Sequence, residues 1–189
     1  MHTSNTALTF AAVTFLAFCS SAARADDEAI IKNAMSAAPA SVANNATIVA
    51  FDDKMQMKVL KKGTNNFTCM PDDPSTPTND PMCADENGME WVHALMTKGK
   101  PPEGKIGFGY MLQGESAASN LDPYAAPPAD GKWYEAGPHV MIFNAKAAMA
   151  GYPKPGAAAP DTTQPWVMWQ DTDFEHLMIP VPGDTAAAQ

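Results

Sequence analysis

Short runs in which apolar and polar residues alternate divide this sequence into predicted β-strands. A period of two places one set of side chains on a buried sheet face and the other set toward solvent. Polar turns such as Asp52-Asp53 separate the first of these runs. The pattern predicts a sheet of about six short strands. The runs cover residues 47–51, 55–60, 67–70, 106–112, 140–144, 166–170 and 176–181.

Two segments have a helical period instead. Residues 26–38 begin with three acidic residues, which favour a helix N-terminus, and Pro39 ends the segment. A second helix is expected from Asp85, its cap, to about residue 97. Because helices and strands do not alternate as in a βαβ fold, the sequence predicts an α+β fold with a mainly antiparallel sheet. The predicted buried face of the second helix is Met89, Val92, His93 and Met96.

The remaining chain is expected to form long, proline-bearing loops. Residues 116–137 and 153–165 are the longest, and a third segment with four prolines lies between Cys69 and Cys83. That third segment has no apolar periodicity and cannot hold itself in place by burial. A disulfide between the two cysteines would close a loop of about 15 residues and stabilise the fold by ~3 kcal/mol.

The first 25 residues have the features of an export signal. Residues 7–18 are small or apolar, a stretch long enough for a signal core and too short to span a bilayer. Ala23-Arg24-Ala25 supplies a cleavage site before Asp26, although Met1–Thr6 lacks the usual Lys or Arg. Cleavage leaves residues 26–189, which are 164 in number and suit one globular domain.

The net charge of the mature chain limits the classes of partner that it is expected to bind. Loss of Arg24 with the signal changes the formal net charge from −9 to −10. So acidic a chain disfavours nucleic acid and anionic membranes, and no later segment is apolar enough to cross a bilayer. We expect an exported protein, periplasmic or secreted, that binds an unidentified ligand or protein partner.

Two similar segments carry the candidate chemistry. His139-Val140-Met141-Ile142 and His176-Leu177-Met178-Ile179 each place an imidazole and a thioether on the same side of a strand. Imidazole and thioether together suit copper, especially Cu(I). Methionine is also a flexible core filler, so ordinary packing is the alternative interpretation. The predicted metal ligands are His139, Met141, His176 and Met178.

A serine hydrolase is a second hypothesis. Gly114-Glu115-Ser116-Ala117-Ala118 resembles the turn that exposes a nucleophilic serine. Asp171 or Asp173, followed by His176, would complete the catalytic order. However, the chain lacks the alternating strands and helices of such enzymes, and a residue pair Asp122-Pro123 follows where a helix is needed.

Two further binding hypotheses rest on other side chains. Asp72, Asp73 and Asp80 could gather oxygen ligands for Ca²⁺, with Asp85, Glu86 and Asn87 beyond them, although their spacing fits no EF-hand loop. Alternatively, large rings could bind a ligand or partner without chemistry. The candidate rings are Trp133, Tyr134, Trp166, Trp169 and Phe174.

Several stretches together resemble a group of exported bacterial proteins that are uncharacterised. They are residues 34–39, 68–72, 80–83, 109–114, 118–120, 137–141 and 175–181. The resemblance covers most of the mature chain and implies an exported bacterial protein, but it brings no reaction, cofactor or catalytic residue. Since no nucleophile, base and orienting group are convincing, a binding or accessory role is favoured over an enzyme.

Overall fold

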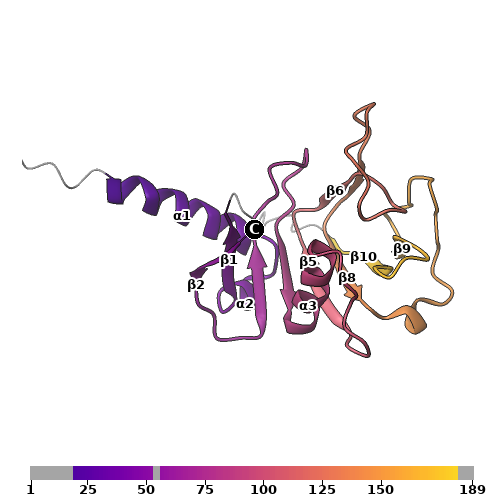
Figure 1. The fold of residues 1–189 in the computed structure, drawn as a ribbon, viewed down its shortest axis with the longest axis horizontal. Helices are drawn as coiled ribbons and strands as arrows, with labels where there is room; N and C mark the ends of the chain where they lie inside the picture. The colour runs from indigo at the N-terminus through magenta and orange to yellow at the C-terminus, as the bar shows by residue number, and fades with distance from the viewer. Residues whose placement is uncertain (1–18, 53–55, 183–189) are drawn as a thin grey trace, which may run out of the picture.

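An eight-stranded, mainly antiparallel sheet forms the centre of the molecule. The computed structural model describes residues 19–52 and 56–182, with side chains from residue 26. The strand order is β2-β1-β3-β4-β5-β8-β10-β9 (Figure 1). Only β1 and β3 pair in parallel among these strands. The strands are β1 (Thr47–Phe51), β2 (Met57–Lys61), β3 (Phe67–Met70), β4 (Met82–Asp85), β5 (Gly107–Met111), β8 (His139–Phe143), β9 (Trp166–Met168) and β10 (His176–Pro180).

A separate two-stranded ribbon extends the central hairpin. It consists of β6 (Glu115–Ala117) and β7 (Tyr134–Ala136), which follow β5 and precede β8. The helices are α1 (Cys19–Met35), α2 (Ala40–Ala43) and α3 (Glu86–Met96), with a 3-10 turn η1 (Lys146–Met149). The predicted α+β class and mainly antiparallel sheet are confirmed.

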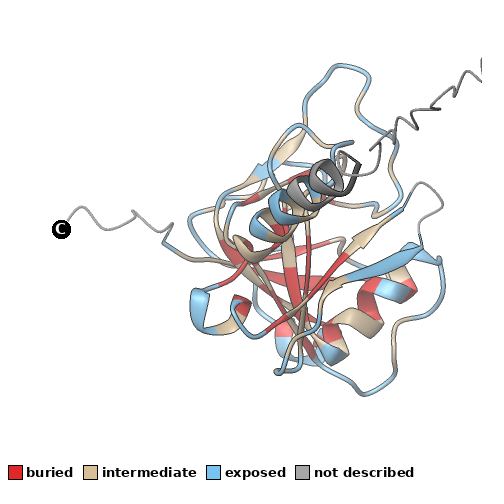
Figure 2. Ribbon diagram, turned by 90° about the vertical axis from the view of Figure 1, so that its left-hand side faces the viewer, coloured by how far each residue is buried: buried red, intermediate tan, exposed pale blue. Residues whose placement is uncertain are grey.

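Both faces of the sheet are covered, and buried residues concentrate along the central strands (Figure 2). On one face α3 packs through Trp91 against the main core, which includes Phe143, Met141 and Met178. On the other face the C-terminal end of α1 and the turn α2 cover β1, β3 and β4 with small alanines. A third cluster of Met149, Val167 and Leu177 lies on the β9–β10 side.

The structure corrects the strand count and the irregular regions. The main sheet has eight strands rather than about six, and β4 lies where a proline-rich loop was expected to run directly into a helix. The ribbon β6–β7 lies at the two ends of the expected loop 116–137. β4 directly follows a run of prolines, and β6 and β7 have only three residues each at the ends of a polar loop, so no apolar pattern marks them in the sequence.

The buried face of α3 also differs from the prediction. Gly88, Trp91, Val92 and Ala94 are buried, whereas His93 is exposed and Met96 is 41 % exposed. Residues 88, 91, 92 and 95 have the same helical spacing as residues 89, 92, 93 and 96, so either set could form the buried face. The first set contains Trp91, and burial of its large indole selects that face. Asp85 caps the helix as predicted, accepting a bond from Gly88 N at 2.7 Å.

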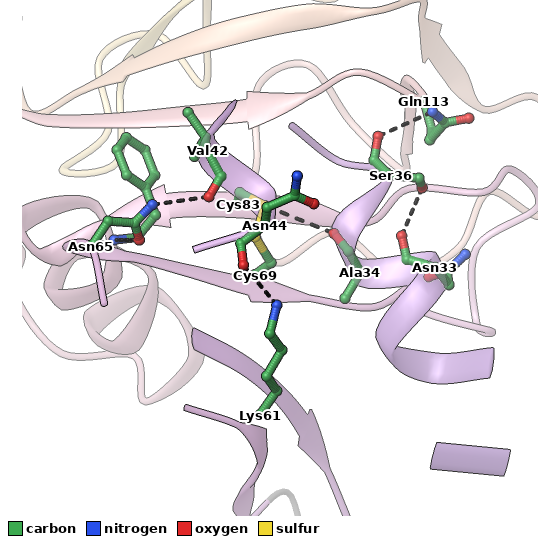
Figure 3. Close-up of a disulfide and its surroundings, with 11 residues drawn as sticks. Asn33, Ala34, Ser36, Val42, Asn44, Lys61, Asn65, Cys69, Cys83 and Gln113 are labelled. Atoms are coloured by element: carbon green, nitrogen blue, oxygen red, sulfur yellow. Dashed lines mark hydrogen bonds between the residues drawn. A yellow bond between two sulfur atoms is a disulfide. The ribbon is translucent and has the colours of Figure 1, made fainter. Parts of the chain in front are cut away.

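The disulfide lies within the sheet. Cys69 and Cys83 are direct partners of β3 and β4, and both are fully buried beneath α1 (Figure 3). The Ala34 carbonyl approaches Cys83 Sγ at 3.8 Å. A disulfide sulfur has no proton to donate, so this is a packing contact. The predicted pairing is confirmed, and it closes the segment that carries the four prolines.

An ion pair between the partly exposed Lys154 and the buried Glu175 holds the long loop before β9. Lys154 Nζ lies 2.8 Å from Glu175 Oε2, and the same oxygen accepts a bond from Asp171 N at 2.7 Å. Glu175 is 4 % exposed. Burial opposes ionisation of Glu175, but the bonds from Lys154 and Asp171 outweigh it and lower its pKa. No helix among residues 19–52 and 56–182 is both long and apolar enough to cross a membrane.

Candidate functional site

The two His-x-Met segments lie side by side on β8 and β10. In the antiparallel register Met141 is directly opposite Met178, while His139 faces Pro180 and His176 faces Phe143. All of these residues are on the face that α3 covers. The two histidines therefore flank the methionine pair at opposite ends, four residues apart along the strands, or roughly 14 Å between α-carbons.

His139 has one ring nitrogen without a partner. Its Nδ1 lies 2.7 Å from the Gly137 carbonyl oxygen, which can only accept, so Nδ1 carries the proton. Nε2 then presents a lone pair. His139 is 1 % exposed, and Nε2 has no hydrogen-bond partner within the part of the chain that the structure describes. Leaving a buried acceptor unsatisfied costs about 1–3 kcal/mol.

Methionine side chains surround His139 on this face. Met111 of β5 is directly opposite His139 in the β5–β8 register. Met141 follows His139 by two residues on the same strand. Met178 of β10 is directly opposite Met141 and therefore diagonal to His139. All three methionines are buried in the main core. Directly opposed side chains have Cβ atoms about 5 Å apart, and diagonal ones are within reach of long side chains. Sequence reasoning missed Met111, because only the strand pairing reveals it.

Strand β5 makes room for this arrangement with two glycines. A Cβ on Gly109 would lie 2.9 Å from the Phe143 ring and 3.0 Å from Met141 Cε. A Cβ on Gly107 would lie 2.4 Å from Gly88 N of α3. The absence of side chains at these positions lets Met141 and Phe143 lie over β5 and lets α3 approach the sheet.

His176 lies in a different environment, among aromatic rings. Its ring centroid is 4.9 Å from Trp169, 5.3 Å from Trp91 and 5.9 Å from Phe143. Its Nδ1 is 3.0 Å from the Phe174 carbonyl oxygen. Burial is the main reason that the pKa of His176 falls to about 4, and the bond to Phe174 opposes the decrease. His176 is therefore neutral at pH 7.

Trp169, one of these rings, has a strained backbone conformation that two hydrogen bonds stabilise. Trp169 has a φ of 53°, a left-handed conformation that costs free energy for a bulky residue. Two hydrogen bonds offset that cost. Trp169 N donates to the Asn120 carbonyl at 2.9 Å and Nε1 donates to the Ser119 carbonyl at 3.0 Å. The indole is thereby positioned against His176.

A half-buried carboxyl, that of Glu115, lies near His139. Glu115 is paired with Ala136, and Ala117 and Ala136 pack against the main core, so Glu115 faces the same side. Loss of solvent contact raises the pKa of the Glu115 carboxyl; the nearby His139 ring opposes this increase and the Asp80 carboxylate adds to it. Among the described residues no three His, Cys, Asp or Glu side chains form a metal site. A metal bound here would therefore need thioether ligands.

Ser116 and the acidic loop have other partners. Ser116 is buried on β6, with its Oγ 2.7 Å from Thr78 Oγ1. No hydrogen bond joins Ser116, the exposed Asp173 and His176 in the described part of the chain, and His176 Nδ1 is bonded to Phe174 rather than to a carboxylate. A nucleophile, base and orienting acid are therefore not brought together.

The loop carboxylates mainly organise their own backbone. Asp73 N donates to Asp80 Oδ1 at 3.0 Å, and Asp80 N donates to Asp72 Oδ1 at 2.8 Å. Asp85 caps α3, and Asn87 donates to the Ile106 carbonyl at 2.9 Å. Aspartates that accept backbone N–H groups in this way are typical turn formers. Trp133 and Tyr134 do not join the aromatic rings around His176; Tyr134 Oη bonds the Ala157 carbonyl at 2.8 Å.

Comparison with known proteins adds no relative. No protein-family model, no curated protein and no solved structure matches the chain. The site must therefore be interpreted from its own geometry.

Proposed function

We propose that this chain is an exported binding or accessory protein that holds Cu(I) with His139 Nε2 and the thioethers of Met111, Met141 and Met178. The observation that carries the proposal is the buried lone pair of His139 Nε2, which has no partner among the described residues. A soft cation would satisfy that lone pair, and thioethers are the ligands that favour Cu(I). The bond from Nδ1 to the Gly137 carbonyl orients the ring as outer-sphere partners orient metal-binding histidines.

This proposal replaces one of the four ligands predicted from the sequence. His176 is separated from His139 by the methionine pair and lies among aromatic rings. Met111 takes its place in the set. The site lies directly beneath the surface, because Gly137, two residues before His139, is exposed.

The two histidines provide a matched pair for the test. Both are buried, and both bond the carbonyl two residues earlier through Nδ1. Cu(I), or Ag(I) as a redox-inert probe, is titrated into the mature protein in competition with a chromophoric chelator. His139→Gln should weaken binding more than about 100-fold, since removing even an outer partner of a metal-bound histidine costs 10–100-fold. His176→Gln should retain binding.

A second set of variants guards against misfolding of His139→Gln. Met111→Leu and Met141→Leu preserve core volume and cost little stability, but each removes one thioether. Weaker binding in both, with an unchanged circular dichroism spectrum, supports the proposal. Equal affinity of parent, His139→Gln and the leucine variants would overturn it, as would a parent that binds neither Cu(I) nor Ag(I).

A further inference from the structure

A second group of soft ligands lies in an open groove on another part of the surface. The groove has a volume of about 720 Å³ and is bordered by α3 and by residues of β1, β2 and β3. Its walls include one histidine and two methionines, His93, Met89 and Met57. None of these residues belongs to the surroundings of His139.

The turn of α3 explains why two of these side chains border the groove. Met89 and His93 are four residues apart and therefore neighbours on one side of the helix. Because Trp91 and Val92 occupy the buried positions of α3, Met89 and His93 lie at the edge of its buried face, where they border the groove. His93 is exposed, and Met89 is half-buried.

The third ligand comes from the opposite wall. Met57 is paired with Phe51, whose side chain packs against the core beneath α3. Directly opposed residues point to the same side of a sheet, so Met57 also lies on the α3 side. Met57 is 54 % exposed, so its thioether is accessible from solvent.

We propose that this groove is a second, solvent-accessible site for a soft monovalent cation, Cu(I) or Ag(I), with His93, Met89 and Met57 as ligands. No hydrogen bond occupies the His93 ring among the described residues, so its nitrogens are available. Glu86 and Glu90 also line the groove, but Lys100 lines it as well and Lys105 pairs with Glu90 at 2.5 Å, so the thioethers and the imidazole, not net charge, would bind the ion.

The two sites differ in access, which separates their roles. The ligands around His139 are buried, whereas the groove ligands are in contact with solvent. An open three-ligand site exchanges its ion rapidly, so it suits capture rather than retention. The inference rests on residues of its own and does not depend on binding at His139.

The test follows the ε-methyl signals of individual methionines by NMR during titration of the mature protein with Ag(I). Met57 and Met89 should shift in the parent, and in His93→Gln their apparent affinity should fall at least about tenfold. Met96→Leu is the matched control, because Met96 is exposed on the same helix but does not line the groove. This variant should titrate like the parent.

The outcomes distinguish the two proposals. Unchanged Met57 and Met89 signals in the parent, or equal affinity in His93→Gln and the parent, would overturn the groove site. The Met141 and Met178 signals report on the His139 site separately. A His139→Gln protein that still shows the Met57 and Met89 shifts would support the groove site even if the buried site failed.

Discussion

At the scale of single residues, two kinds of feature shape the core around β8: glycines that leave space for neighbouring atoms, and buried histidines whose surroundings differ. Gly107 and Gly109 leave space that α3, Phe143 and Met141 occupy. His176 is held neutral by burial among aromatic rings. His139, by contrast, has a buried Nε2 lone pair that no residue of the described ranges bonds. Two histidines with the same local hydrogen bond thus differ in what surrounds the second nitrogen.

Gly107→Ala tests the close approach of α3 to β5. The new Cβ would meet Gly88 N at 2.4 Å and Gly88 Cα at 2.5 Å, and backbone atoms cannot move aside cheaply. We expect a loss of about 2 kcal/mol or more in the free energy of unfolding. Gly137→Ala is the control, since nothing lies within 4 Å of its added Cβ, and it should change stability by less than about 0.5 kcal/mol. Urea unfolding of both variants measures the difference.

His176 should make stability depend on pH. Its folded pKa of about 4 lies below the ordinary value of 6.5, so the unfolded state binds more protons between these limits. Stability is complete above pH 6.5 and falls as the pH decreases toward 4. Between pH 7 and pH 5 the loss from this group is about 2 kcal/mol.

NMR titration of the His176 ring and urea unfolding of His176→Gln check this prediction. The variant should lose the part of the pH dependence that belongs to His176. A measured pKa between 6 and 7 in the folded protein would contradict it.

At the scale of elements, the sequence predicted most strands of the main sheet but missed β4 and the ribbon β6–β7. β1 and β3 have the expected bounds, and α3 has the expected cap. The central strand β4 was missed because its four residues follow a run of prolines, and β6 and β7 because each has only three. The face of α3 depended on tertiary packing of Trp91, which the spacing alone did not specify. Three of the four residues of the candidate site, His139, Met141 and Met178, came from the repeat, but Met111 required the β5–β8 register.

The ion pair of Lys154 and Glu175 should stabilise the loop before β9. Lys154→Met leaves a buried carboxylate without its cation, so we expect a lower melting temperature at pH 7. Because the pKa of Glu175 is lowered in the folded protein, this contribution is present above its ordinary value and disappears as Glu175 becomes protonated in acid.

Lys132→Met is the matched control for this ion pair. Lys132 is paired with Asp130 at 3.4 Å, but both side chains are well exposed, so its loss should leave the melting temperature unchanged. Equal melting temperatures for parent and Lys154→Met at pH 7 would show that the pair does not fasten the loop.

At the scale of the whole molecule, the disulfide is consistent with the proposed export and with the proposed soft-metal sites. The buried Cys69–Cys83 bridge fits an oxidising compartment. Much of the expected signal, residues 1–18, lies outside the described residues, and α1 runs across the expected cleavage point before Asp26. A protein exported in this way would meet copper before the metal enters the cell.

Intact-mass analysis of the protein recovered from the periplasm of a bacterial host tests this combination. The mass should correspond to residues 26–189 with one disulfide, two hydrogen masses below the reduced form. Cys69→Ala with Cys83→Ala should unfold about 3 kcal/mol more easily. A full-length protein retained in the cytoplasm, or two free thiols, would contradict the prediction.

The two outer strands of the sheet have a consequence for solubility at high local concentration. A free strand edge is a template on which another chain can assemble. Here β9 has only three residues before the strained turn at Trp169, which leaves little edge to pair with. The other outer strand, β2, carries Lys58 and Lys61 along its length. A short strand at one edge and lysines on the other, although Lys58 is paired with Asp27, are features that disfavour pairing of this sheet with a second chain.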